Sequence, residues 1–84
     1  MVVGCTTLGA LYDSGQGVSR DYTQARALYE RACDGGEMTG CNNLGFLYYK
    51  GRGVYKDLAQ ARTLWTRACA GGVQAACTSL RRTN

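Results

Sequence analysis

The sequence contains no histidine and no proline, and no apolar run approaches the roughly 20 residues that a membrane-spanning helix needs. Without histidine, catalytic zinc sites lose their usual ligand and Ser–His–Asp hydrolases lose their usual base. The short apolar runs exclude a transmembrane protein. Residues 1–10 contain neither a basic segment nor a long apolar segment, so we expect no signal peptide here.

The excess of charge of one sign is also small, since 10 basic and 6 acidic residues give a net charge of only +4. Residues 4–39 have a net charge of −2, whereas residues 40–75 have +4 and Arg81 and Arg82 add two more positive charges. A bias of this size is typical of a solvated surface and does not predict nucleic-acid binding. Its functional interpretation is head-to-tail attraction between copies, or an acidic partner for the C-terminal half.

The dominant feature is an internal repeat with a period of 36 residues. Residues 4–39 and 40–75 are identical at 19 of 36 aligned positions, and Cys77 and Leu80 begin a third copy. A period in this range is typical of solenoid proteins. We therefore expect a single domain over residues 1–84, with repeat one at 4–39, repeat two at 40–75 and a partial third repeat or capping helix at 76–84.

Each repeat has the apolar spacing of two helices. In the first repeat the two apolar stripes are Cys5, Leu8, Leu11 and Tyr12, and then Ala25, Leu28, Tyr29 and Ala32. Trp65 aligns with Tyr29, so we expect it in the core of the second helix of its repeat. Tyr55 lies in a loop and is expected at the surface.

Glycines and aspartates mark the expected ends of these helices. Gly-x-Gly at 15–17 and 51–53 allows positive φ and ends the first helix of each repeat. Asp21 with Gln24, and their counterparts 36 residues later, have the spacing of a capping box, which starts the second helix near Tyr22 or Leu58. The second helices end at the Gly-Gly pairs, 35–36 and 71–72.

Gly9 and Gly45 fall in the middle of the first helices, where glycine costs about 1 kcal/mol relative to alanine. The expected compensation is the close approach of a neighbouring helix, because no side chain holds the backbones apart.

Five cysteines repeat with the architecture, and two pairs are eight residues apart. A Gly-Gly turn between the members of each pair folds the chain back and brings them within reach. The residues alone leave three interpretations open. These are Cys33–Cys41 with Cys69–Cys77, or Cys5–Cys33 with Cys41–Cys69, or five buried thiols in a reducing compartment.

No motif predicts catalysis, a metal or a cofactor. The Gly-x-Gly loops do not complete G-x-G-x-x-G, because Arg20 and Lys56 occupy the last position. No serine begins a Ser-x-x-Lys acylation motif. The chain has no Cys-x2-Cys pair for zinc. We therefore expect no enzyme activity, no metal and no cofactor.

The repeated motifs resemble the Sel-1-like repeat, a relative of the tetratricopeptide repeat. The matching residues are Leu8-Gly9-x-Leu11-Tyr12, Gly15-x-Gly17-Val18-x-x-Asp21, Gln24-Ala25 and Arg31-Ala32-Cys33, with their counterparts 36 residues later. The cysteines resemble those of the Helicobacter cysteine-rich protein family, which are secreted Sel-1-like solenoids with disulfide-linked helix pairs. The resemblance implies an all-α fold, a short right-handed solenoid of αα-hairpin repeats stapled by disulfides.

The same resemblance favours the pairing Cys33–Cys41 and Cys69–Cys77, and leaves Cys5 as a free or intermolecular thiol. Each bridge would stabilise the fold by roughly 2–3 kcal/mol. Disulfides in turn predict a periplasmic or secreted bacterial protein.

The resemblance also implies a non-catalytic protein–protein interaction module. In tetratricopeptide-like solenoids the first helices line the concave surface that holds a peptide or protein. The positions expected on that surface vary between the repeats, whereas the packing positions do not. They are Thr6, Ala10, Asp13, Asn42, Phe46, Tyr49, Thr78 and Arg82.

Four alternatives to this interpretation remain open at the level of sequence. Phe46 is equally explained by packing against a neighbouring helix. Weak penicillin binding follows only from family analogy, and a purely structural repeat with no ligand is a further reading. Uncapped solenoid ends expose apolar surface, which predicts weak self-association.

Overall fold

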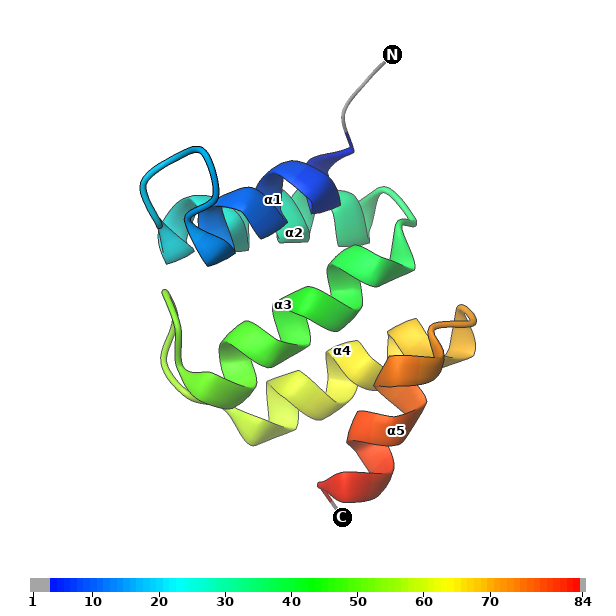
Figure 1. Cartoon of the computed structure of the whole chain (residues 1–84). Helices are drawn as coiled ribbons and strands as arrows, with labels where there is room; N and C mark the ends of the chain where they lie inside the picture. The colour runs from blue at the N-terminus through cyan, green and yellow to red at the C-terminus, as the bar shows by residue number, and fades with distance from the viewer. Residues whose placement is uncertain (1–3, 84) are drawn as a thin grey trace.

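The computed structural model describes residues 4–83, which form five helices and no strand. In chain order they are α1 (Cys5–Ser14), α2 (Tyr22–Asp34), α3 (Met38–Lys50), α4 (Leu58–Ala70) and α5 (Gln74–Arg82). Helices α1 and α2 form one antiparallel hairpin, α3 and α4 form the next, and α5 follows at the other end of the molecule (Figure 1). The predicted all-α hairpin fold is confirmed.

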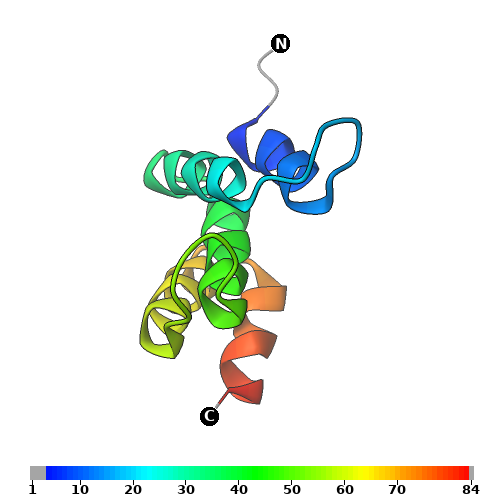
Figure 2. The ribbon, with the colours of Figure 1, turned by 90° about the vertical axis from the view of Figure 1, so that its left-hand side faces the viewer.

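The hairpins are stacked, and each helix packs mainly on its neighbours in the chain. The main contacts join α1 to α2, α2 to α3, α3 to α4 and α4 to α5, while α1 touches α3 only lightly. The side view shows the α1–α2 hairpin at one end and α4 with α5 at the other (Figure 2). This nearest-neighbour packing is what defines a solenoid.

Aspartate side chains start the second helix of each repeat, as the sequence predicts. Asp21 accepts hydrogen bonds from the backbone N–H groups of Thr23 and Gln24, at 3.1 and 3.2 Å. The reciprocal half of a capping box is replaced by a longer-range bond, because the Asp21 N–H donates to the carbonyl of Tyr12 at 2.9 Å. The same bond recurs 36 residues later, so each loop is tied back to the helix before it.

The first helix of each repeat ends at a glycine in the left-handed region. Gly15 and Gly51 have φ values of 74° and 69°, and their N–H groups close the last turns of α1 and α3. This conformation costs glycine little and other residues much, which explains the abrupt change of chain direction at these two points.

The core is built on two buried aromatic rings, each lying against a glycine of the preceding helix. Tyr29 and Trp65 are both 1% exposed. A Cβ added to Gly9 would lie 2.7 Å from the Tyr29 ring, and one added to Gly45 would lie 2.6 Å from Nε1 of Trp65. The mid-helix glycines are therefore compensated by close approach, and the group that approaches is an aromatic ring. The prediction that Trp65 belongs to the core is confirmed.

The two repeats differ in burial at equivalent positions. Leu44 is 4% exposed, whereas its counterpart Leu8 is 36% exposed. The sequence places both leucines in the apolar stripe of the first helix, and the structure buries only Leu44. Helix α3 lies between α2 and α4, while α1 has no helix on its outer side among residues 4–83.

Two disulfides staple consecutive helices. Cys33 pairs with Cys41 and Cys69 pairs with Cys77, with Cα–Cα distances of 4.6 and 4.8 Å. The first bridge joins the end of α2 to α3, and the second joins the end of α4 to α5. This confirms the pairing that the family resemblance favours, and Cys5 is a free, half-buried thiol.

Removing the two bridges separately should give different losses of stability. Each bridge spans eight residues, so loop entropy assigns each about 2.5 kcal/mol. Cys33 and Cys41 are buried, whereas Cys69 and Cys77 are half-buried, so serine pairs leave unpaired buried hydroxyls only at the first bridge. Urea denaturation should show the Cys33→Ser, Cys41→Ser pair losing about 1–3 kcal/mol more than the second pair. Equal losses would contradict this account.

The ring-on-glycine contact predicts that Gly45→Ala destabilises the chain, although alanine favours helices elsewhere. Overpacking against Trp65 should cost about 1–3 kcal/mol, which exceeds the gain of about 1 kcal/mol in helix propensity. Thermal and urea unfolding measure the change. Thr66→Ala, at an exposed position of α4, is the control and should stay within about 0.5 kcal/mol of the parent. An unchanged or higher stability of Gly45→Ala would rule out the close contact.

Candidate functional site

A cleft of about 680 Å³ lies where α1, α3 and the beginning of α2 meet. The loops after α1 and after α3 contribute to its lining. Its lining comprises Thr7, Ala10, Leu11, Asp13 and Ser14 of α1, Gln16 and Arg20 of the first loop, Tyr22 and Tyr29 of α2, Asn43, Phe46, Leu47 and Lys50 of α3, and Arg52 of the second loop.

Five pairs of equivalent positions of the two repeats line the cleft. Thr7, Ala10, Ser14 and Gln16 correspond to Asn43, Phe46, Lys50 and Arg52, and Leu11 corresponds to Leu47. The first four pairs differ in residue type and the fifth is identical, although more than half of all aligned positions are identical. The repeats have therefore diverged in side-chain chemistry at the surface that they share.

Tyr29 forms the polar floor of the cleft. Its hydroxyl donates a hydrogen bond to Oδ2 of Asp13 at 3.1 Å. Burial raises the pKa of Tyr29, the charge of Asp13 and the hydrogen bond to it raise this pKa further, and a hydrogen bond with Asn43 partly offsets them. The floor is thus a network of three side chains drawn from α1, α2 and α3.

Phe46 forms an apolar wall of the cleft and packs against the buried core residue Trp65. Its ring meets Trp65 edge-on, with centroids 5.1 Å apart. Tyr49 also packs on Trp65, at 5.5 Å, and is 37% exposed. Phe46 is therefore both a packing residue, as the alternative reading of the sequence held, and a lining residue of the cleft.

Cations gather at the end of the cleft that the loop residues line. Arg20 and Arg52 lie over the same ring, Tyr22, with guanidinium carbons 5.7 and 5.4 Å from its centroid. Lys50, at the end of α3, lines the same end of the cleft. Asp13 is the one carboxylate in the lining, and it is already bonded to Tyr29.

The structure brings together only some of the eight residues predicted for the partner surface. Ala10, Asp13 and Phe46 line the cleft. Thr6 faces α3, since a Cβ added to Gly40 would lie 3.0 Å from its hydroxyl oxygen, and Asn42 is only 8% exposed. Tyr49 lies on Trp65, while Thr78 and Arg82 belong to α5 and do not line the cleft.

The sequence reasoning missed nine lining residues that carry polar or charged groups. These are Thr7, Ser14, Gln16, Arg20, Tyr22, Tyr29, Asn43, Lys50 and Arg52. The divergence of Thr7 from Asn43 and of Ser14 from Lys50 was a usable signal for the two helices. Arg20 and Arg52 come from loops of different repeats, and no spacing within one repeat predicts that they meet.

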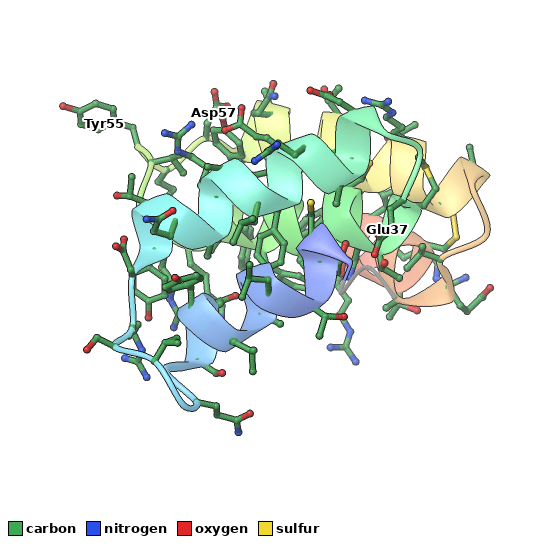
Figure 3. The ribbon with its side chains drawn as sticks, turned by 90° about the horizontal axis from the view of Figure 1, so that it is seen from above. Glu37, Tyr55 and Asp57 are labelled. Carbon is green, nitrogen blue, oxygen red and sulfur yellow. A yellow bond between two sulfur atoms is a disulfide. The ribbon has the colours of Figure 1, made fainter. Side chains whose placement is uncertain are left out.

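A second hollow, of about 760 Å³, lies beside the loop between α3 and α4. It is bordered by Arg26, Tyr48 and the loop residues around Tyr55. Tyr55 is 96% exposed and points away from the body of the molecule (Figure 3), which confirms its predicted place at the surface.

Residues 4–83 contain neither a cluster of metal-ligand side chains nor a helix that could span a membrane. In this part of the chain no three or more His, Cys, Asp or Glu side chains gather as metal ligands would. Likewise, no helix described here has the length and apolar character to cross a membrane.

Stacked helix hairpins with divergent side chains on a shared cleft define an α-solenoid repeat protein. The family model described as Sel1 repeat matches residues 3–37 and 39–73. The comparison with curated proteins gives no match. The chain belongs to the Sel1 repeat family, as the sequence motifs indicate, and proteins of this family are typically protein-interaction modules and generally non-catalytic.

Solved structures of Sel1 repeat proteins are similar over 90% of this chain. A Sel1 repeat protein from Oxalobacter formigenes has a TM-score of 0.88 and 29% identity. Cysteine-rich protein B of Helicobacter pylori has 0.83 and 37%, and a protective antigen present in uropathogenic Escherichia coli strains has 0.85 and 32%. The chain spans only 31%, 57% and 16% of these three proteins, respectively.

The Tyr29–Asp13 pair predicts a specific loss of stability at alkaline pH. The raised pKa means that the folded chain retains the Tyr29 proton where the unfolded chain releases it, above pH about 10. This contribution is fully present below that pH and is lost as the pH rises, by at most about 1.4 kcal/mol per unit. Tyr29→Phe does not show this loss. The difference in free energy of unfolding between the parent and the variant should therefore become smaller from pH 8 to pH 11.

Urea denaturation at both pH values measures this difference, in a Cys5→Ser background so that no free thiolate attacks the disulfides. Tyr55→Phe removes the same hydroxyl from an exposed position and should follow the parent. A constant difference between the parent and Tyr29→Phe would contradict the prediction.

Proposed function

We propose that the chain binds a peptide or protein segment in the cleft between α1 and α3. The observation that carries this proposal is the divergence of the lining residues on an otherwise repeated scaffold. The helices, caps and glycines recur every 36 residues, while four of the five equivalent pairs that line the cleft differ in residue type, Leu11 and Leu47 being the identical pair. In repeat proteins such divergence on a concave surface is where binding specificity resides.

The shape and chemistry of the cleft suit an extended segment with mixed side chains. Ala10, Leu11 and Phe46 offer apolar surface, and Thr7 and Asn43 offer polar groups beside it. A few polar groups within an apolar lining fix the orientation of a ligand, which is the usual composition of a specific binding site. The family's typical role in protein interaction supports the same conclusion.

The chemistry of the cleft favours binding over catalysis. Two lining residues carry an aliphatic hydroxyl. Thr7 has no histidine base available, because the chain contains no histidine, and the hydroxyl of Ser14 donates to the carbonyl of Ala10 at 2.9 Å. A serine engaged with its own helix is not activated for acylation, which requires an adjacent base. The proposed function therefore carries no chemical step.

The two disulfides support a place outside the cytosol, in the periplasm or as a secreted protein. Thiols in a reducing cytosol rarely form stable structural bridges. The similarity to cysteine-rich protein B of Helicobacter pylori is consistent with the same location.

The proposed cleft can be tested by selecting peptides from a random phage-displayed library. NMR chemical-shift mapping then shows where the selected peptides bind on the protein. Thr7→Trp fills the cleft from an exposed position and should weaken the selected peptides at least about tenfold, since it occupies the site without touching the core. Thr66→Trp adds the same ring on α4, outside the cleft, and should leave affinity unchanged. If the selected peptides bind Thr7→Trp with the same affinity as the parent and shift resonances outside the cleft, the proposal is wrong.

A further inference from the structure

The end of the cleft that the loop residues line holds positive charge that no carboxylate among residues 4–83 neutralises. Arg20, Lys50 and Arg52 are all exposed, and none of them forms an ion pair within residues 4–83, where Arg26 pairs with Glu30. Asp13, the single carboxylate in the lining, accepts the hydrogen bond of Tyr29. The lining therefore carries an excess of two positive charges.

The two arginines are positioned as a pair by one aromatic ring. Both guanidinium groups lie within 5.7 Å of the Tyr22 ring centroid, which attracts each of them through its quadrupole. Holding the arginines in place reduces the entropy that each would lose on binding a carboxylate.

This arrangement is a feature of the cleft and not of the repeat. Tyr22 corresponds to Leu58 in the second repeat, and Arg52 corresponds to Gln16 in the first. The arginine pair arises only because the loop of repeat two approaches the start of α2. A Cβ added to Gly53 would lie 2.8 Å from the backbone of Tyr22, so this approach is close.

We infer that the segment held in this cleft is acidic, and that its side-chain carboxylates bind Arg20 and Arg52. This inference rests on the proposed function and adds the chemical class of the partner. Lys50 contributes charge at the same end, and Phe46 with Leu11 accepts an apolar side chain next to the acidic one. Arginine forks suit carboxylates because two parallel N–H groups can reach both oxygens.

Fluorescence anisotropy with two synthetic peptides tests the inference. The first is a fluorescein-labelled peptide of about ten residues with alternating Leu and Glu, amidated at its C-terminus so that side chains supply all the carboxylates. The second has Gln in place of every Glu. The Glu peptide should bind roughly tenfold more tightly at low salt, and raising the ionic strength should reduce the difference.

Charge-removing variants locate the binding. Arg20→Gln and Arg52→Gln should each weaken the Glu peptide about fivefold, and should leave the Gln peptide unchanged. Lys56→Gln is the matched control, because Lys56 is the exposed counterpart of Arg20 in the second repeat and borders the other hollow. It should change affinity less than about twofold. Far-ultraviolet circular dichroism confirms that each variant is folded.

The remaining outcomes distinguish failure of the acidic preference from failure of the cleft as the binding site. If the Glu and Gln peptides bind equally and Thr7→Trp weakens both, the acidic preference is wrong while the cleft remains the binding site. If the Glu peptide is preferred but Thr7→Trp has no effect, the proposed cleft fails. No binding of the Glu peptide at about 1 mM, or equal binding of single-stranded DNA, overturns the inference as well.

Discussion

The contact on which the rest of the structure depends is an aromatic ring seated on a glycine. Tyr29 on Gly9 and Trp65 on Gly45 bring the two helices of each hairpin together, and each ring is almost completely buried. A methyl group in place of the glycine hydrogen would overlap the ring. The contact therefore sets how closely the first helix of a hairpin lies on the second, and a mid-helix glycine that weakens an isolated helix becomes a requirement of the folded hairpin.

Covalent and polar links then join one hairpin to the next. The Cys33–Cys41 bridge follows the tight turn after α2, and Arg67 of α4 donates to the carbonyl of Cys33 at 3.2 Å. At the other end, Arg62 donates to the carbonyl of Leu80 and to the hydroxyl of Thr83. These links bind the last turns of α2 and α5, which a chain with so small a core could not hold by apolar packing alone.

Sequence reasoning predicted the parts of the structure that local chemistry determines. Asp21 and Asp57 mark the starts of α2 and α4, and the glycines that follow mark the helix ends, because capping and left-handed backbone depend only on residues a few positions apart. The family resemblance supplied the disulfide pairing. The aspartate caps, the helix-ending glycines and the paired cysteines each occur in both repeats, so the sequence provides two independent instances of each.

The cleft was predicted less well, for two physical reasons. Adjacent residues of a helix point about 100° apart. Sequence reasoning assigned Thr6 and Asn42 to the partner surface, but they lie between helices, and their neighbours Thr7 and Asn43 line the cleft. The arginine pair on Tyr22 combines loops from different repeats. Periodicity within a repeat carries no information about contacts that form only when repeats stack.

The floor of the cleft shows that its chemistry is coupled to the core beneath it. At one position of the repeat the buried ring is Tyr29, whose hydroxyl reaches the cleft and is bonded to Asp13. At the equivalent position the ring is Trp65, whose N–H is bonded to the Asn42 carbonyl at 3.2 Å, and Tyr49 occupies the place of Asp13 and packs on the indole.

A carboxylate in contact with Trp65 would lack a donor there, and an aromatic side chain beside Tyr29 would leave its buried hydroxyl without this partner. The side chain at the Asp13 and Tyr49 position of the first helix is therefore matched to the buried ring at the Tyr29 and Trp65 position of the second. The two repeats differ at both positions together, while the backbone that carries them stays constant.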